Sequence, residues 1–245
     1  GEYCTMPLMT AVFAEAVKVG AHPYTRFLVP EHEEIFLKHA TDEQLKFIHP
    51  AMRTDVNKMD VLLHIWGNQN TRNLSGVNPE RQALQRKYQR PISDRLHKRI
   101  DAGEMRWCGT LFPTDAQAQE ADMSLSDWED FVYNAGHVTK GDPVKHWNSV
   151  RKEQARLIKI LNKIDQLHIR SANTDLKMRV KGRNWVNCAG EQNFPDGEVF
   201  TSPIENTVEG VINFSFPAIY NGREVENVRL ELKKGKVVSE SATKN

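Results

Sequence analysis

The sequence predicts an α/β protein, in which an N-terminal domain with a parallel sheet and helices on both faces is followed by a β-rich segment. Before residue 170, apolar strand-like runs alternate with helical periodicity, which is typical of parallel strands connected by helices. After residue 170, apolar and polar residues alternate and hairpin turn signals recur, which indicates antiparallel strands. We therefore predict a domain boundary near residue 170, dividing the chain into 1–170 and 171–245.

Helices in the first part are predicted from first-turn prolines, capping residues and apolar side chains at helical spacing. Thr41 and Gln44, for example, have the spacing of a capping box, in which each side chain bonds a backbone amide of the first turn. Ser126 and Glu129 have the same spacing, and Pro50 is expected to end the helix that begins near Thr41. Helices are thereby predicted at 7–19, 41–49, 79–90 and 93–102, from 114, from 126, and at 142–166.

Strands of the parallel sheet are predicted from three apolar runs, at 27–29, 60–67 and 105–112. The run at 60–67 is almost continuously apolar, as is typical of a parallel strand buried on both faces. In the second part, the alternating pattern predicts strands at 167–172, 175–180, 184–189, 209–216 and 223–232. Asn221-Gly222 and Lys234-Gly235 are hairpin turn signals within this part.

Composition excludes several classes of protein. The 33 Lys+Arg residues balance 32 Asp+Glu residues, so the basic excess of a nucleic-acid or anionic-membrane binder is missing. No apolar run reaches the roughly 18–20 residues that span a bilayer.

Three distant cysteines, Cys4, Cys108 and Cys188, exclude a disulfide scaffold and a Cys-only zinc site, and they are typical of a reducing cytosol. Residues 1–10 have no signal-peptide pattern. We therefore expect a cytoplasmic protein.

The densest group of candidate functional residues lies at 191–205, where four carboxylates occur in fifteen residues. Carboxylates on a rigid loop or strand edge can bind a divalent ion or serve as general acids and bases. A solvated turn rich in turn-forming residues is the alternative interpretation. Nucleotide-binding, serine-hydrolase and H-E-x-x-H motifs are absent from the sequence. The four carboxylates belong to Glu191, Asp196, Glu198 and Glu205.

The segment from 174 to 210 resembles the thermophilic metalloaminopeptidase family, which contains aminopeptidases T and S. The resemblance is carried by TDL at 174–176, GR at 182–183, Trp185, NFPDGEVFTSP at 193–203 and EG at 209–210. Residues 15–24 are similar to the family's N-terminal domain. The resemblance implies an enzyme that releases N-terminal amino acids from peptides, forms a homodimer and holds two divalent metal ions in its C-terminal domain. Residues 171–245 would then be the β-rich start of that metallopeptidase domain.

The family's pattern carries one metal ligand onto this chain, the glutamate of G-E-V-F-T, which is Glu198. Asp196 and Glu205 are weaker candidates for contacts to the metal ligands or to the substrate. The family's other ligands (a second Glu, two His, a Tyr and an Asp) would lie beyond Asn245, and the opening strand of the family's N-terminal domain is missing from the sequence. We therefore expect the chain to be truncated at both ends. Alone, it is expected to bind metal weakly and to be inactive. Zinc, cobalt and manganese remain open as the metal.

A different class of function remains open: a non-catalytic binding or assembly module, or an inactive fragment that keeps the family's scaffold. Its support is the absence of the remaining ligands from the chain. Under the enzyme hypothesis the partners are peptide substrates and a second copy of the chain, with no nucleic acid and no membrane. The N-terminal half, which shows no motif for a nucleophile, a metal or a nucleotide, is expected to shape or shield the substrate entrance.

Overall fold

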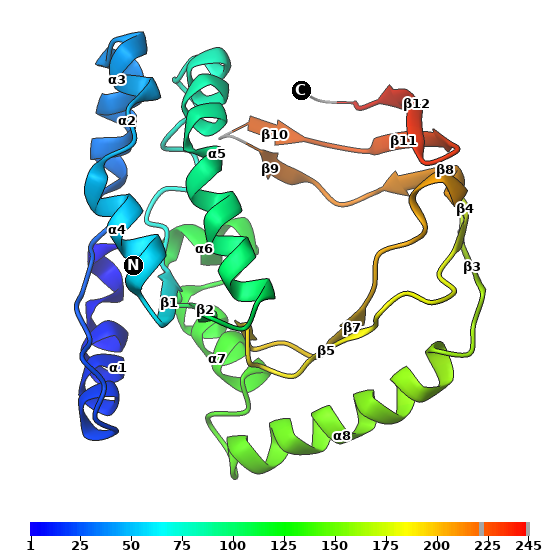
Figure 1. The fold of residues 1–245 in the computed structure, drawn as a ribbon, viewed down its shortest axis with the longest axis horizontal. Coiled ribbons are helices and arrows are strands. Elements are labelled where there is room, and N and C mark those ends of the chain that lie inside the picture. Colours follow the sequence, from blue (N-terminus) through cyan, green and yellow to red (C-terminus); the bar gives the residue numbers. More distant parts are fainter. Residues whose placement is uncertain (221–222, 244–245) are drawn as a thin grey trace. The chain divides into compact units, whose positions relative to one another are not determined.

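The computed structural model describes residues 1–220 and 223–243, and their contacts divide into two compact units (Figure 1). Unit 1 comprises Gly1–Thr139 with Glu191–Pro195, and unit 2 comprises Lys140–Gly190 with Asp196–Asn245. A parallel sheet with helices and a separate antiparallel sheet confirm the predicted α/β fold class. The domain boundary near residue 170 stays a prediction.

Unit 1 is built on a parallel sheet in the strand order β1-β2-β6, with β1 at Val61–Trp66, β2 at Arg106–Leu111 and β6 at Asn193–Phe194. Leu37, Leu45 and Val77 form a buried cluster among the helices. The helical elements are η1 (Tyr3–Thr5), α1 (Met6–Lys18), α2 (Pro30–His39), α3 (Asp42–Lys46), α4 (Pro50–Lys58), α5 (Pro79–Asp101), α6 (Asp115–Glu120) and α7 (Leu125–Ala135).

Two of the predicted strands in unit 1 differ from the structure. The predicted buried strand at 27–29 is wrong: Leu28 forms a single bridge with Glu2, and the three side chains at 27–29 are 40–48% exposed. The run is short and ends at Pro30, which begins α2, so it cannot extend into a ladder. Strand β1 is confirmed, but its burial is less complete than predicted, because Ile65 is buried while Leu63 is exposed.

The helix ends in unit 1 agree with the predicted capping box but not with the positions predicted from prolines. The capping box is confirmed: Gln44 N–H donates to Thr41 Oγ1 at 3.2 Å, and Thr41 N–H donates to Gln44 Oε1 at 2.7 Å. Pro50 begins α4 instead of ending the preceding helix, as a proline in the first helical turn can. Pro91 lies inside α5, so the two helices predicted at 79–90 and 93–102 are one helix.

The N-cap of α7 is Ser124 and not Ser126, because the Ser124 hydroxyl accepts a hydrogen bond from Asp127 N–H at 3.1 Å. Asp142 is the N-cap of α8, in agreement with the predicted helix start at 142, and its carboxylate accepts from Lys145 N–H at 3.0 Å. That helix, α8, spans Pro143–Leu161 in unit 2 and ends before the predicted residue 166. Gln166 instead begins the first strand of the antiparallel sheet.

Unit 2 contains a five-stranded antiparallel sheet in the order β12-β11-β8-β4-β3, two separate two-stranded sheets and helix α8 (Figure 1). The two-stranded sheets are β5-β7 and β10-β9. The elements are β3 (Gln166–Ser171), β4 (Thr174–Arg179), β5 (Val186–Cys188), β7 (Glu198–Phe200), η2 (Glu205–Thr207), β8 (Glu209–Phe214), β9 (Ala218–Tyr220), β10 (Arg223–Val225), β11 (Val228–Lys233) and β12 (Lys236–Ser241).

The antiparallel strands largely follow the sequence pattern. Lys234-Gly235 forms the predicted turn between β11 and β12, with φ of +50° and +74°. Asn221-Gly222, the other predicted turn, lies outside the described residues. The single strand predicted at 223–232 is two strands, β10 and β11, with Asn227 between them at a φ of +49°.

Among the described residues, no helix is both long enough and apolar enough to span a bilayer.

Three exposed carboxylates of unit 2 are expected to make its stability fall in acid. The Asp165 pKa lies below its ordinary 3.8 because Arg179 donates two hydrogen bonds to it, at 3.0 and 3.2 Å. Hydrogen bonding from His168 likewise lowers the pKa of Asp175, and Glu205 also has a lowered pKa. A lowered folded-state pKa adds stability above the unfolded-state pKa, and this stability is lost as pH falls through the folded-state value.

Thermal unfolding followed by circular dichroism between about pH 5 and pH 2.5 tests this expectation. The midpoint of the wild-type protein should fall with pH, and Asp165→Asn should show a shallower dependence because it lacks one of the titrating groups. Identical slopes for the two proteins would contradict the assignment to Asp165.

Candidate metal centre

The candidate site is formed by two short antiparallel strands of unit 2, β5 and β7. Their register pairs Val186 with Phe200 and Cys188 with Glu198. Side chains of directly opposed residues lie on the same face of a strand pair, so this pairing brings the Cys188 thiol beside the Glu198 carboxylate. Beyond the other end of the ladder, the Thr201 hydroxyl donates to the Asn184 carbonyl at 2.6 Å and helps to hold this register.

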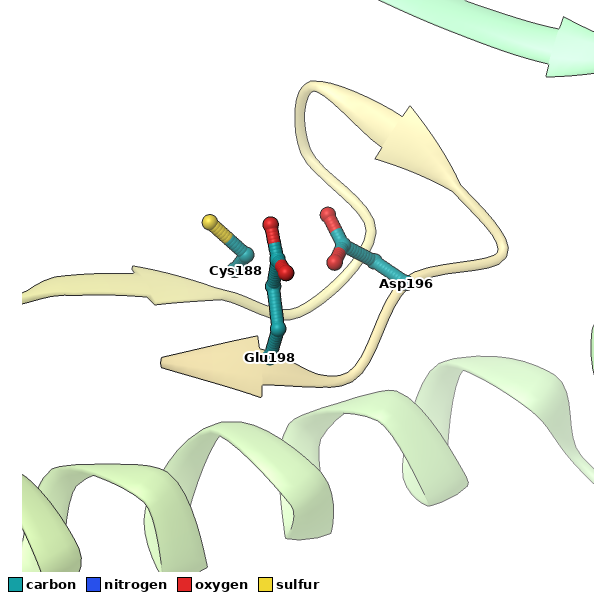
Figure 2. Close-up of side chains that lie close together, drawn as sticks. All are labelled: Cys188, Asp196 and Glu198. Atoms are coloured by element: carbon teal, nitrogen blue, oxygen red, sulfur yellow. The ribbon is translucent and has the colours of Figure 1, made fainter. Parts of the chain in front are cut away.

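Figure 2 shows the side chains of Cys188, Asp196 and Glu198 converging. One potential ligand atom from each, the Cys188 sulfur and a carboxylate oxygen of each acid, lies within 4.8 Å of the others. Cys188 is buried, Asp196 is partly buried and Glu198 is exposed. The structure therefore joins Glu198, the predicted ligand, to Asp196, the weaker candidate, and adds a sulfur donor.

The Asp196 carboxylate has one satisfied oxygen and one orphaned oxygen. Its Oδ1 accepts a hydrogen bond from Gly197 N–H at 2.9 Å, and the same N–H donates to the Cys188 carbonyl at 3.1 Å. Its Oδ2 is buried and has no hydrogen-bond partner among the described residues. A buried acceptor without a donor is unfavourable by about 1–3 kcal/mol, and more when it is charged. A cation beside Oδ2 would supply the missing interaction.

Gly197 gives the chain the turn that separates Asp196 from Glu198. Its φ is +124°, a conformation that residues with a Cβ rarely adopt. The turn lets the carboxylates at 196 and 198 reach the same point although one lies in the loop and the other begins β7. A glycine is thus favoured at position 197 by the positive φ of its backbone and not by lack of space for a side chain.

Helix α8 supports the strand pair, since both β5 and β7 contact it. The Asn187 side chain donates to the Arg151 carbonyl of α8 at 3.0 Å and so ties β5 to the helix. Figure 2 shows the helix alongside the strands, while the three clustered side chains extend from the strand pair and its loop. A metal bound there would therefore lie on a supported strand pair.

Glu205 lies outside this cluster. It begins η2, where its carboxylate is 2.6 Å from an Arg183 guanidinium nitrogen. The pKa of Glu205 is lowered, first by a hydrogen bond from its own backbone amide and then by the Arg183 charge. Its side chain is 84% exposed. The structure gives Glu205 an ion pair at the surface and no contact with Asp196 or Glu198.

Cys188 is the member of the cluster that sequence reasoning missed. Its signal was available, because the predicted strand at 184–189 ends near it and Glu198 begins β7, the next strand of unit 2 along the chain. Antiparallel pairing of those strands would have placed the two residues opposite each other. The sequence pattern does not specify pairing partners, so by itself it shows Cys188 only as one of three distant cysteines.

The sulfur and carboxylate donors fit a divalent cation. Zinc binds cysteine sulfur and carboxylate oxygen, whereas carboxylates without sulfur also suit manganese and other harder ions. The orphaned Asp196 oxygen supports the same interpretation. Three residues supply part of the coordination sphere that a zinc-like or manganese-like ion requires.

The chain is similar to a family of metalloproteases and to several aminopeptidases. The family model described as Thermophilic metalloprotease (M29) matches residues 1–245. Aminopeptidase AmpS of Bacillus subtilis (strain 168) is 28% identical over 156 residues, covering 59% of this chain and 37% of the relative. Aminopeptidase T of Thermus aquaticus is 29% identical over 149 residues, covering 56% and 36%. Aminopeptidase 2 of Geobacillus stearothermophilus is 27% identical over 187 residues, covering 69% and 45%.

Among solved structures, wild-type AmpT from Thermus thermophilus matches with a TM-score of 0.80 at 20% identity. The match covers 100% of this chain and 65% of that chain, and at this identity it demonstrates a shared fold. The matched region spans 36–45% of the length of the three curated relatives.

Proposed function

The chain belongs to the thermophilic metalloprotease (M29) family, and from this membership we propose that the whole protein is a metal-dependent aminopeptidase. It would release N-terminal amino acids from peptides. The observation that carries the proposal is the convergence of Cys188, Asp196 and Glu198 around the orphaned Asp196 oxygen, within the segment that the family model matches. Three curated relatives of this chain are named aminopeptidases.

Glu198 and Asp196 would hold the metal with their carboxylates. Glu198 presents an exposed carboxylate from the first residue of β7, whereas Asp196 is anchored through Oδ1 to Gly197 N–H. A bound divalent ion would supply Lewis-acid polarisation of the scissile carbonyl and an activated water. The strand register holds the backbone from which Glu198 extends, and the hydrogen bond from Gly197 N–H restrains the Asp196 carboxylate.

Further features are part of this proposal. The active protein would hold two divalent ions, zinc, cobalt or manganese, and would act as a cytoplasmic homodimer on peptides. Residues 1–170 would form its N-terminal domain and 171–245 the start of its catalytic domain. Near-neutral charge, with 33 basic and 32 acidic residues, supports a protein that binds neither nucleic acid nor an anionic membrane.

A chelator experiment on the whole protein tests the proposed activity. Aminoacyl chromogenic substrates should be hydrolysed, and treatment with a chelator should lower the rate by about 100-fold or more, because the metal polarises the carbonyl and activates the water. Addition of zinc, cobalt or manganese should restore the rate. Activity that resists the chelator would contradict the proposal. No activity with any of these ions would favour the non-catalytic module.

A further inference from the structure

We propose that Cys188 supplies a sulfur ligand at the metal position of Glu198 and thereby makes this position prefer zinc over manganese. The inference rests on the proposed metal function and deepens it, since it concerns which ion the site takes. Metal binding by the two carboxylates alone would not require a cysteine at position 188, and the inference gives this cysteine a role.

The position of the thiol carries the first step. Cys188 is the residue directly opposite Glu198 in the β5–β7 ladder, and its sulfur lies within 4.8 Å of carboxylate oxygens from both Glu198 and Asp196. The residue is only 5% exposed, so its place is set by the strand pair and not by a mobile surface chain. A buried cysteine most often acts as a small apolar side chain, but two carboxylates make this environment polar.

The second step comes from the carboxylates. The Asp196 Oδ2 atom is buried and without a hydrogen-bond partner among residues 1–220 and 223–243. A divalent cation beside Oδ2 would supply the missing interaction, and the ligand atoms within its reach would include the Cys188 sulfur. The cluster thus indicates a cation and places the thiol beside it.

The third step is ligand chemistry. A thiol that binds a metal gives up its proton to solvent, and the resulting soft sulfur ligand favours zinc over harder manganese. Sites built only from carboxylate and imidazole groups discriminate less between these ions. Replacement of the sulfur by an oxygen, or its removal, should therefore weaken zinc binding more than manganese binding.

Titration calorimetry on the metal-free whole protein tests the inference, with Zn²⁺ and Mn²⁺ titrated separately. Cys188→Ser and Cys188→Ala should each weaken zinc binding by on the order of 10–100-fold, a loss typical of disturbed metal sites. Manganese affinity should change by less than about 3-fold, because a hard ion gains little from sulfur. Cys108→Ser, in unit 1, is the matched control and should bind both ions as the wild type does.

Cobalt provides an independent spectroscopic readout on the same proteins. The wild type and Cys108→Ser loaded with Co²⁺ should show a sulfur-to-cobalt charge-transfer band in the near ultraviolet, and both Cys188 variants should lack it. Unchanged zinc affinity, equal losses for zinc and manganese, or a band that persists without Cys188 would overturn the inference. If neither variant folds, as judged by far-ultraviolet circular dichroism, the wild-type spectrum decides, and absence of the band overturns it.

Failure of this inference can be distinguished from failure of the proposed function. Glu198→Gln should weaken binding of both ions, since the carboxylate serves either metal. If it does so while the Cys188 variants bind zinc normally, only the role of the thiol is wrong. If the wild-type protein binds neither ion, both the proposed function and this inference are overturned.

Discussion

Glu198→Gln is expected to lower the proposed aminopeptidase activity of the whole protein by at least about 100-fold while leaving its fold intact. The substitution keeps the size and hydrogen-bonding capacity of the side chain but removes the charge that attracts the cation. Loss of even an indirect partner of a metal ligand typically lowers affinity or activity 10–100-fold, so loss of a direct ligand should do at least as much. Because the Glu198 side chain is exposed, the fold should tolerate the change.

Turnover of an aminoacyl chromogenic substrate, measured with saturating metal, checks this expectation. Glu205→Gln is the matched control, because it is the same substitution seven residues later at a side chain that pairs with Arg183 outside the cluster. The control should retain near-normal activity. Near-normal turnover of Glu198→Gln would refute the assignment of Glu198 as a metal ligand, and a large loss in Glu205→Gln would show that the active site extends beyond the cluster.

Gly210→Ala is expected to destabilise unit 2 by about 3 kcal/mol or more. Gly210 lies in the central strand β8, opposite Leu176 of β4 and Leu232 of β11. Its φ is +117°, and an added Cβ would overlap the backbone carbonyl of Asp175. A backbone atom within the sheet cannot rotate away as a flexible side chain can. The substitution therefore combines backbone strain with a steric clash at the centre of the sheet.

Urea unfolding of the wild type, Gly210→Ala and Gly182→Ala measures this effect. Gly182 also has a positive φ, +75°, but an added Cβ would meet no atom within 4 Å. Gly182→Ala should therefore lower the free energy of unfolding only by the strain of a left-handed residue, about 1–2 kcal/mol. Equal losses in the two variants would contradict the predicted clash at Gly210.

Signals confined to a few neighbouring residues were sufficient to predict several elements. The Thr41–Gln44 capping box and the Lys234-Gly235 turn depend on side chains and φ angles within one turn of chain, so the sequence determines them directly. The strands β1, β2, β3 and β4 follow from apolar patterns, and their parallel or antiparallel pairing follows from the type of connection. The fold class could therefore be predicted.

Signals that depend on surroundings were ambiguous in the sequence. A proline can end a helix, begin one or lie within one, and the structure has Pro50 at a helix start and Pro91 in a helix interior. An apolar run can be a strand only where another strand is available along its length. Residues 27–29 have a single bridge instead, between Leu28 and Glu2. These outcomes depend on neighbours that lie far away in the sequence.

The same division applies to the candidate site. The sequence by itself predicts Glu198 as a metal ligand, because a contiguous string of residues carries the family's pattern, and it offers Asp196 as a weaker candidate in the same string. Only the tertiary structure placed Cys188 in the cluster and Glu205 outside it. Strand register sets which side chains face each other, and residues ten positions apart, Cys188 and Glu198, become cross-strand neighbours when the two strands pair antiparallel. Such proximity is a property of the folded backbone, which no local pattern of residues specifies.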